Sequence, residues 1–412
     1  YTTEHTLSLH DALPISVRTQ VWEKIRAGQP PDERAVAAVV EQQRAVLGAG
    51  GVAAVTRGLA AAVLGAGPLE ALLTEPGVTD VAVNGDGSVW VDRGAGMQRV
   101  SVELGDAAAR RVLAVRLAAS AGRRLDEAAP WCDAVLPSGV RLHAVLPPLV
   151  PDGAHLTLRV PSRAAWSLEG LVAAGLVEPA LRVVLEGLVR SRVSFVVTGG
   201  TGTGKTTLLA ALLALVPTDE RIVVVEDVRE LAVEHPHVVR LAGRSANVEG
   251  VGEVTMVALV RQALRMRPDR LVVGEVRGPE VRELLAALNT GHEGGCGTVH
   301  ANSVADVLAR FEALGALAGM DRRAVHAQLV SAVQVIVHLR RDAGGRFVDS
   351  VAVVGRGGDG AGSGEPQVRP AWAGSRGGPV DAVARGRLLK LAGLEGRSPL
   401  GATDAPAGGE AG

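Results

Sequence analysis

The sequence is poor in aromatic residues and in cysteine. Its 412 residues include three Phe, one Tyr and five Trp, so aromatic side chains make up only 2% of the chain. Any hydrophobic core must therefore be built from Ala, Val and Leu, and hydrophobic residues do reach 47%. Cys132 and Cys296 are the only cysteines, which excludes a disulfide framework and a cysteine-based zinc site. We expect a protein of the reducing cytoplasm.

The chain also lacks an excess of basic charge and a long apolar run. Its formal net charge is −1 at pH 7, whereas a nucleic-acid-binding protein usually carries a basic footprint. No apolar run approaches the roughly 20 residues that are needed to span a bilayer. We therefore expect no direct nucleic-acid partner and only peripheral association with a membrane.

The first sixteen residues do not resemble a native N-terminus. Residues 1–16 (YTTEHTLSLHDALPIS) have no initiator Met, no basic region and no helical stripe, which argues against a signal peptide. They resemble the translation of a sequencing adapter at the edge of an assembled fragment. We interpret them as a non-native segment, so the true N-terminus stays open.

Two regions of different texture precede the centre of the chain. Residues 17–64 carry apolar residues at helical spacing around a Pro30-Pro31 break, which predicts N-terminal helices. A docking arm for a partner is the alternative interpretation of these helices. Residues 65–162 alternate short strand patterns with one helical pattern over 106–121, which predicts a small α+β domain. Arg141 and Arg159 lie near strand ends of this domain.

A glycine-rich stretch follows an apolar run and precedes another. Residues 199–207 read GGTGTGKTT and fill the pattern G-x-x-x-x-G-K-[ST] of a phosphate-binding loop. Glycines let the backbone curl so that several N–H groups point at one anion, and the following helix presents its positive end. The alternative is a glycine-rich turn that happens to contain a lysine. The predicted nucleotide-binding residues are Gly199, Gly200, Thr201, Gly202, Thr203, Gly204, Lys205, Thr206 and Thr207.

Strand and helix patterns alternate around this loop. Residues 180–341 predict a mainly parallel sheet covered by helices, with its ligand at the carboxyl ends of the strands. Residues 163–179 are interpreted as a linker that includes a short amphipathic helix. Residues 342–412 are rich in Gly, Asp and Arg, and we predict a low-complexity, partly disordered tail.

Acidic residues end two of the predicted strands. Residues 222–230 (IVVVEDVRE) end in Glu226 and Asp227, which could order a water or act as its general base. Residues 271–275 (LVVGE) end in Glu275, at the position where phosphate-loop enzymes hold magnesium. A pair of acidic turn residues is the alternative for the first cluster.

A third cluster carries histidines. Residues 291–303 (GHEGGCGTVHANS) place His292 and His300 on either side of a glycine-rich turn. A histidine can donate to phosphate at neutral pH and so report its loss. A zinc site with Cys296 lacks the usual ligand spacing, and a purely structural pair of histidines stays possible.

These four clusters, in this order, resemble the secretion-ATPase superfamily that powers type II and type IV secretion, type IV pili and conjugation. The resemblance covers residues 67–340, and its branch is closest to the Tad/Flp pilus and conjugal-transfer ATPases. The branch is indicated by VTDVAVNG over 78–85, by the run over 133–148, by RPDRLVVGEVRG over 267–278 and by TVHANS over 298–303. In the family's terms the boxes are Walker A (residues 199–207), aspartate (Glu226-Asp227), atypical Walker B (Gly274-Glu275) and histidine (residues 292–300).

The resemblance implies a RecA-like fold and a set of residue roles. Lys205 and Thr206 would bind phosphate and Mg²⁺, Glu275 would help hold the metal, Glu226 would be the general base and His300 would sense the γ-phosphate. Arginines often complete such sites, and the candidates are Arg141 and Arg159, followed by Arg261 and Arg265.

The resemblance also implies an assembly. The enzyme would hydrolyse ATP in a homo-hexameric ring at the cytoplasmic face of the inner membrane. Closure of its two domains on ATP would drive an inner-membrane platform protein. A nucleic-acid translocase of related core and a nucleotide-locked scaffold are the alternative functions.

Overall fold

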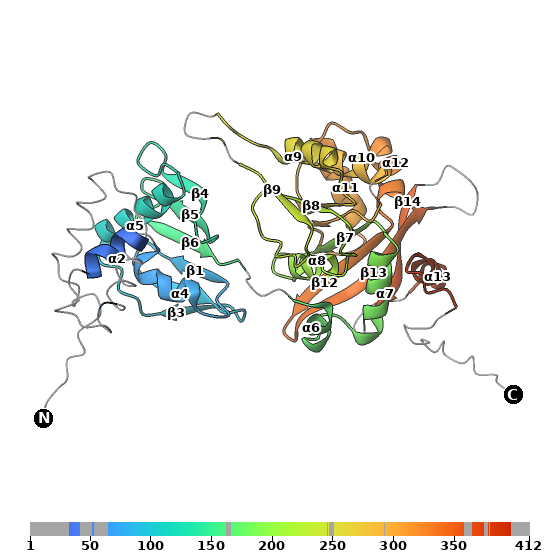
Figure 1. Ribbon diagram of the computed structural model, residues 1–412, viewed down its shortest axis with the longest axis horizontal. Helices are drawn as coiled ribbons and strands as arrows, with labels where there is room; N and C mark the ends of the chain where they lie inside the picture. Colours follow the sequence, from blue (N-terminus) through green and yellow to red (C-terminus); the bar gives the residue numbers. More distant parts are fainter. Residues whose placement is uncertain are drawn as a thin grey trace, which may run out of the picture. The chain divides into compact units, whose positions relative to one another are not determined.

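The computed structural model describes residues 33–41, 52, 65–161, 166–244, 246, 251–291, 293–357, 365–374, 378 and 380–396. They fall into two compact units, Tyr1–Pro161 and Ser162–Gly412, and each unit is considered by itself (Figure 1). The predicted non-native segment, most of the predicted N-terminal helices, His292 and the chain end lie outside the described residues. A helix, α2 (Glu33–Glu41), is described within the predicted helical region.

The first unit is built on a six-stranded antiparallel sheet with the order β3-β2-β1-β6-β5-β4. Apolar side chains that alternate along the strands form its core, together with the apolar face of one long helix. This arrangement confirms the predicted α+β class. The elements are η1 (Gly67–Leu69), α4 (Glu70–Thr74), β1 (Asp80–Val83), β2 (Val89–Asp92), β3 (Met97–Val100), α5 (Ala107–Ser120), β4 (Trp131–Val135), β5 (Arg141–Val145) and β6 (His155–Arg159).

Helix α5 shows how local sequence sets an element. Asp106 is its N-cap, and the Asp106 carboxylate accepts a hydrogen bond of 2.8 Å from the backbone N–H of Ala109. Leu113 and Leu117 lie one helical turn apart and are buried in the core of the unit. The helix ends before Gly122, whose φ of 68° lies in the left-handed region. The prediction of a helix over 106–121 is confirmed.

The second unit is built on an eight-stranded sheet with the order β14-β13-β12-β7-β11-β10-β8-β9. The strands from β12 to β9 in this order are parallel, and β13 and β14 are antiparallel additions to one side. The strands are β7 (Phe195–Gly199), β8 (Ile222–Glu226), β9 (Val238–Ala242), β10 (Arg270–Val276), β11 (Cys296–Val299), β12 (Val335–Asp342), β13 (Gly345–Arg356) and β14 (Pro366–Ala373).

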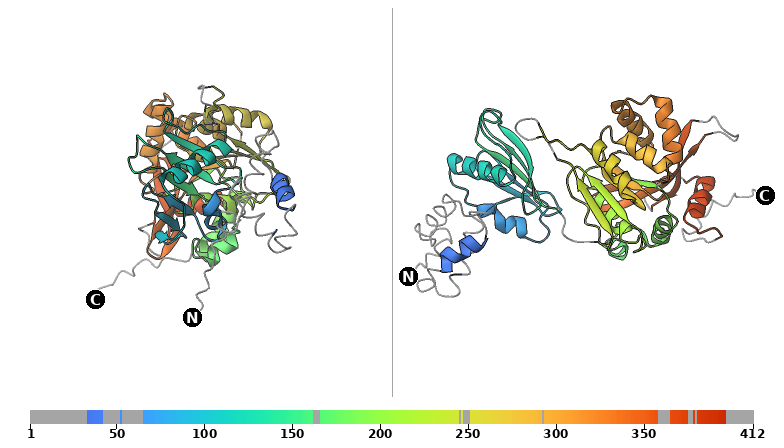
Figure 2. Two further views of the ribbon diagram at one scale, coloured as in Figure 1. Left: turned by 90° about the vertical axis from the view of Figure 1, so that its left-hand side faces the viewer. Right: turned by 45° about the horizontal axis from the view of Figure 1, so that its top comes forward.

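Helices cover both faces of this sheet (Figure 2). Successive residues of β7 point to opposite sides, so Phe195 and Val197 join one core and Val196 joins the other. The predicted α/β fold with a mainly parallel, RecA-like sheet is confirmed. One face carries α6 (Leu168–Ala173), α7 (Pro179–Arg190), α8 (Lys205–Leu213) and α13 (Ala382–Leu391), and the other carries α9 (Met256–Ala263), η2 (Leu264–Met266), α10 (Val281–Asn289), α11 (Val307–Leu317) and α12 (Arg322–Ala332).

The second unit extends beyond the predicted limits of 180 and 341 on both sides. Within the predicted linker, Leu168 and Leu171 of α6 are buried in the core that α7 and α8 also fill. Within the predicted tail, β13, β14 and α13 are ordered, and Val351 and Leu388 are fully buried. Each segment contains a short apolar pattern that its overall composition does not reveal. Burial of these apolar side chains explains why both segments belong to the second unit.

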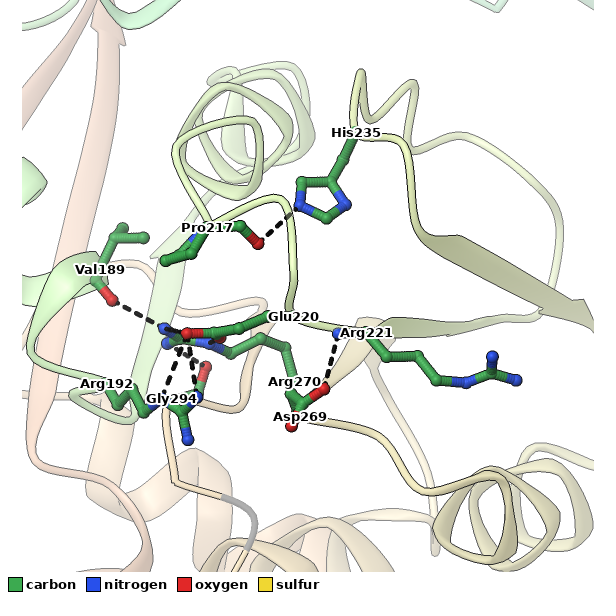
Figure 3. A network of polar contacts seen from close by, with 9 residues as sticks. All are labelled: Val189, Arg192, Pro217, Glu220, Arg221, His235, Asp269, Arg270 and Gly294. Atoms are coloured by element: carbon green, nitrogen blue, oxygen red, sulfur yellow. Dashed lines mark hydrogen bonds and ion pairs between the residues drawn. The ribbon is translucent and has the colours of Figure 1, made fainter.

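A buried polar network joins the connections at the amino ends of the strands (Figure 3). Arg270 begins β10, is 1% exposed and donates to the Glu220 carboxylate, with Nε 2.5 Å from Oε2. Its Nη2 atom donates to the Val189 carbonyl at 3.0 Å, and Arg192 also pairs with Glu220 at 3.0 Å. Burial alone would raise the pKa of Glu220, but the two arginines hold it below the ordinary value.

This network predicts a large loss of stability in Arg270→Ala. The substitution leaves Glu220, a residue that is 7% exposed, with Arg192 as its one remaining ion-pair partner among the described residues, and breaking a buried pair usually costs about 3–5 kcal/mol. The control is Arg192→Ala, which should cost below about 1 kcal/mol because the Arg192 side chain is 45% exposed. Urea unfolding at pH 7 measures both, and equal effects of the two substitutions would contradict this role for Arg270.

Candidate nucleotide site

Four strands of the second unit bring their carboxyl ends to one edge of the sheet. Parallel pairing places Val299 beside Thr198, Val276 beside Val299 and Val273 beside Val225. The segments that follow these positions carry the four predicted clusters. The sequence prediction that the clusters gather at the strand ends therefore matches the register of the sheet.

The phosphate loop joins β7 to α8. Its glycines Gly199, Gly202 and Gly204 have φ values of 147°, 71° and 97°, which residues with a side chain rarely adopt. A Cβ on Gly199 would lie 2.5 Å from the Leu339 carbonyl oxygen, so glycine is also required sterically. Gly204 is the N-cap of α8 and has no side chain to cap the helix, so the first turn can offer its N–H groups to an anion.

Lys205 folds back over this loop. Its Nζ donates to the carbonyl oxygens of Gly199 and Gly200, at 3.0 and 2.8 Å, and lies 3.3 Å from His300 Nε2. The residue is 8% exposed, and burial lowers its pKa while Glu275 opposes the shift. The ammonium group is thus held at the centre of the site, within reach of any anion that the loop binds.

His300 connects Lys205 to Glu275. Its Nε2 lies 3.2 Å from Glu275 Oε1 as well as near Lys205 Nζ. Burial and then the Lys205 charge lower the pKa of His300, and Glu275 opposes them. Burial and the Lys205 charge therefore favour the neutral form of the imidazole. One nitrogen cannot accept from Lys205 and donate to Glu275 together, so its hydrogen bonding responds to charge placed between those side chains.

Glu226 ends β8 and is 3% exposed. Its Oε1 accepts hydrogen bonds from the backbone N–H groups of Glu230 and Leu231, both at 2.9 Å. Its Oε2 is buried and has no hydrogen-bond partner among the described residues. Burial raises the pKa of Glu226 despite the two backbone donors. A buried carboxylate oxygen normally has a partner, so this atom suits a water or a transferred proton.

Gly274 gives Glu226 its space, which predicts a large effect of Gly274→Ala on turnover. A Cβ at this position would lie 2.6 Å from Glu226 Cγ, so the carboxylate would have to move. A displacement of a catalytic group by about 1 Å can lower the rate by up to about 100-fold. The control is Gly386→Ala in α13, where a Cβ meets nothing within 4 Å. Steady-state phosphate release measures both variants, and an unchanged rate in Gly274→Ala would rule out this placement of Glu226.

Asp227 differs from its neighbour Glu226. Its side chain is 48% exposed and forms an ion pair with Arg277, which follows β10. The two acidic residues of the predicted aspartate box therefore have different environments. Glu226, which is buried, fits the role of a general base. Asp227, which is exposed, links the segment after β8 to the segment after β10 through its ion pair with Arg277.

Thr206 and Glu275 are the predicted magnesium ligands. Thr206 lies in the first turn of α8, and the Glu275 side chain is 41% exposed at the end of β10. Mg²⁺ usually takes one or two protein oxygens and completes its shell with water and substrate phosphate, so a hydroxyl and a carboxylate fit it. Among the described residues there is no group of three or more His, Cys, Asp or Glu that could hold a metal ion. Burial raises the pKa of the Cys296 thiol to about 12, which disfavours its use as a zinc ligand.

The predicted arginines lie in three places. Arg141 and Arg159 are direct cross-strand partners on β5 and β6 of the first unit, and Arg159 pairs with Asp80 at 3.3 Å. Arg261 on α9 pairs with Glu283 on α10 at 2.6 Å, and Arg265 lies in η2. Their part in nucleotide binding stays a prediction.

Sequence reasoning missed two other arginines. Arg341 and Arg346 lie at the end of β12 and the start of β13, beside the phosphate loop. The signal for them is the turn pattern over 340–346 (RRDAGGR) between two apolar runs. Because the sequence predicts that the domain ends at residue 341, the prediction does not include this hairpin.

Comparison with known proteins gives a consistent family. A model described as "Type II/IV secretion system protein" matches residues 63–353. A Mycobacterium tuberculosis protein named "putative conjugal transfer protein" is 55% identical over 333 residues, which cover 79% of this chain and 93% of that protein. Protein VirB11 of Agrobacterium fabrum is 31% identical over 309 residues, covering 66% and 88% respectively. The solved VirB11 ATPase of Brucella suis matches with 27% identity and a TM-score of 0.36, over 69% of this chain and 92% of that one.

Proposed function

The chain belongs to the type II/IV secretion system protein family, and we propose that within it the chain acts as an ATP-hydrolysing motor. One observation carries the hydrolytic step. Glu226 presents a buried carboxylate oxygen without a partner among the described residues, on the same sheet edge as the phosphate loop. Lys205, Glu275 and His300 form a connected group at that edge.

In this proposal the loop N–H groups, Lys205 and Thr206 bind the triphosphate. Bound Mg²⁺, held through Thr206 and Glu275, would neutralise charge on the β- and γ-oxygens. Glu226 accepts a proton as the oxygen of a water forms a bond to the γ-phosphorus. The bond between that phosphorus and the bridging oxygen breaks, which leaves ADP and phosphate. A carboxylate with a raised pKa is well matched to this proton transfer.

His300 is proposed to report the γ-phosphate. A bound triphosphate competes with the loop carbonyls for the Lys205 ammonium, which now lies 3.3 Å from His300 Nε2. The neutral imidazole then gains or loses one hydrogen-bond partner as the phosphate arrives or leaves. A change of this kind can bias a loop between two arrangements.

The finer parts of the proposal concern assembly. The motor would be a homo-hexamer that drives an inner-membrane platform protein from the cytoplasmic face, with membership of the Tad/Flp pilus and conjugal-transfer branch. Closure of the first unit on the ATPase unit would convert hydrolysis into movement. Family membership and the sequence boxes support these parts. Among the residues that the structure describes, no helix is both long and apolar enough to cross a bilayer.

The environment of Glu226 predicts the pH dependence of turnover. The carboxylate must be deprotonated to accept a proton, and its pKa is raised by burial above the ordinary value of 4.5. The acid limb of a plot of kcat/KM against pH should therefore lie above pH 4.5. The raised pKa also affects stability. Because the folded state takes up this proton at a higher pH than the unfolded state, the free energy of unfolding should rise as the pH falls through this window. A rate that stays flat down to pH 4.5 would contradict the assignment.

ATP hydrolysis with and without DNA, combined with sizing of the same samples, tests the proposal against its rivals. The motor predicts turnover by an oligomer that DNA does not change. A translocase predicts stimulation by DNA with a steep salt dependence, and a scaffold predicts binding without turnover. A protein that stays monomeric and does not hydrolyse ATP, alone or with lipid vesicles and a platform protein, would refute it.

A further inference from the structure

A buried histidine that the proposed mechanism does not use lies beside the start of the phosphate loop. His338 of β12 is 1% exposed, and its register partner on β7 is Thr198, which is fully buried and directly precedes Gly199. His338 Nδ1 lies 2.9 Å from Thr198 Oγ1. The two strands are therefore joined by side chains as well as by backbone at the point where the loop begins.

The register of the sheet places this pair in one row with the strand that carries His300. Val299 of β11 is the register partner of Thr198 on its other side, and side chains of one row point to the same face of a sheet. On that face, Val299 and Ala301 are both buried in the core that the helices α9 to α12 cover. The segment around His300 therefore packs on the same face as the His338 side chain.

The His338 ring interacts with this segment as well as with Thr198. Burial lowers the pKa of His338, while Asp349 and a backbone hydrogen bond with Asn302 oppose the shift. Nε2 is buried and makes no shorter hydrogen bond to a described residue. A neutral ring has one accepting and one donating nitrogen. With the hydrogen on Nε2, the ring accepts from the Thr198 hydroxyl and donates toward the Asn302 carbonyl, so this tautomer serves both neighbours.

The start of the loop also sets the position of Lys205. The Lys205 Nζ atom donates to the Gly199 carbonyl at 3.0 Å and lies 3.3 Å from His300 Nε2. Gly199 follows Thr198 directly, and a Cβ on Gly199 would lie 2.5 Å from the Leu339 carbonyl oxygen of β12. A shift of Thr198 relative to the His300 segment would therefore change how the Lys205 ammonium meets the imidazole.

We propose that His338 is a positioning residue of the nucleotide site, which holds the start of the phosphate loop against the segment that carries His300. The inference rests on the proposed hydrolysis of ATP and adds a residue that is too deeply buried to contact the nucleotide itself. His338 acts through Thr198 on one side and through Asn302 on the other. Because a displacement of about 1 Å at a site can lower the rate by up to about 100-fold, we expect its loss to affect kcat more than binding.

Steady-state ATP hydrolysis and equilibrium titration of the full chain with MgATP test this inference. His338→Leu and Thr198→Val each remove one side of the contact and should lower kcat by about tenfold. The Kd for MgATP should stay within about threefold of the wild type, because the loop N–H groups and Lys205 are retained. The double variant should be no slower than His338→Leu, since both substitutions break the same contact. Additive losses would show that the two residues act separately and would overturn the assignment.

His338→Asn is the conservative variant, because its amide oxygen can accept from the Thr198 hydroxyl in place of Nδ1. It should keep kcat within about threefold of the wild type. A loss as large as that of His338→Leu would contradict a role through Thr198. If His338→Leu does not fold, Thr198→Val decides, because valine preserves the shape of the threonine side chain.

His326→Leu is the matched control for a purely structural role. His326 of α12 is another buried histidine, at 8% exposed, and its Nε2 pairs with Glu312 Oε1 at 2.6 Å. This variant should unfold at a lower temperature than the wild type but keep its kcat well below that temperature. If both leucine variants lose kcat in proportion to their loss of thermal stability, His338 has only a structural role.

Two further outcomes separate this inference from the proposed function. If the wild type hydrolyses ATP and both His338→Leu and Thr198→Val turn over at the same rate, the positioning role fails and the proposed function stands. If the wild-type chain itself hydrolyses no ATP, the proposed function fails and the positioning role fails with it.

Discussion

Replacing Glu226 by glutamine is expected to lower kcat for ATP hydrolysis by about 10²- to 10⁴-fold, the usual effect of losing a general base. Glutamine keeps an oxygen that can accept from the N–H groups of Glu230 and Leu231, so the loop should keep its shape. It cannot accept the proton of the attacking water. ATP affinity should stay within about threefold of wild type, because the phosphate loop is untouched. Phosphate release and nucleotide titration measure the two quantities.

Glu234→Gln is the matched control for this variant. Glu234 is exposed and lies on the same segment after β8, so the same chemical change there should leave kcat unaltered. If neither Glu226→Gln nor the wild type hydrolyses ATP, the result would support the scaffold function. Equal and substantial rates would remove Glu226 from the mechanism.

Replacing Lys205 by alanine is expected to weaken MgATP binding by about 10- to 100-fold. A charge-assisted hydrogen bond contributes about 1.5–3 kcal/mol, and the Lys205 ammonium is the cation held within the loop itself. Without nucleotide the variant should be about as stable as the wild type, since removing a buried ammonium offsets the lost hydrogen bonds to the loop. ATP at 100 times the wild-type Kd adds about 2.7 kcal/mol of stability to the wild type, and the same ATP concentration should add only about 0.4–1.4 kcal/mol to the variant.

Lys390→Ala is the matched control, because the Lys390 side chain on α13 is 73% exposed. Thermal shifts with increasing MgATP measure the effect in both variants. A full ATP-dependent shift in Lys205→Ala would contradict the role of this residue.

The local parts of the fold could be predicted from the sequence. The strands β7, β8 and β10 are buried on both faces and so read as continuous apolar runs. The phosphate loop can be predicted because its glycines are required by local backbone geometry. Glu226 and Glu275 are predicted as site residues because they end such strands. These features depend on residues that are near one another in the chain.

The parts that were missed depend on contacts between distant residues. Thr198 and His338, which are 140 positions apart, are linked by a hydrogen bond of 2.9 Å in the β7–β12 pairing. That pairing brings the β12–β13 hairpin beside the phosphate loop, and no local pattern specifies it. The placement of the Glu226 side chain depends likewise on the close approach of Gly274 from another strand.

Hydrolysis of γ-labelled ATP by the full chain with Mg²⁺ tests the central claim most directly. The nucleotide is mixed with excess protein, the reaction is stopped at intervals, and ADP and free phosphate are separated from ATP. The account predicts that bound ATP is converted to ADP and phosphate, and that Glu226→Gln binds ATP but converts it at least about 100-fold more slowly. Wild-type protein that binds ATP and leaves it intact would contradict the account.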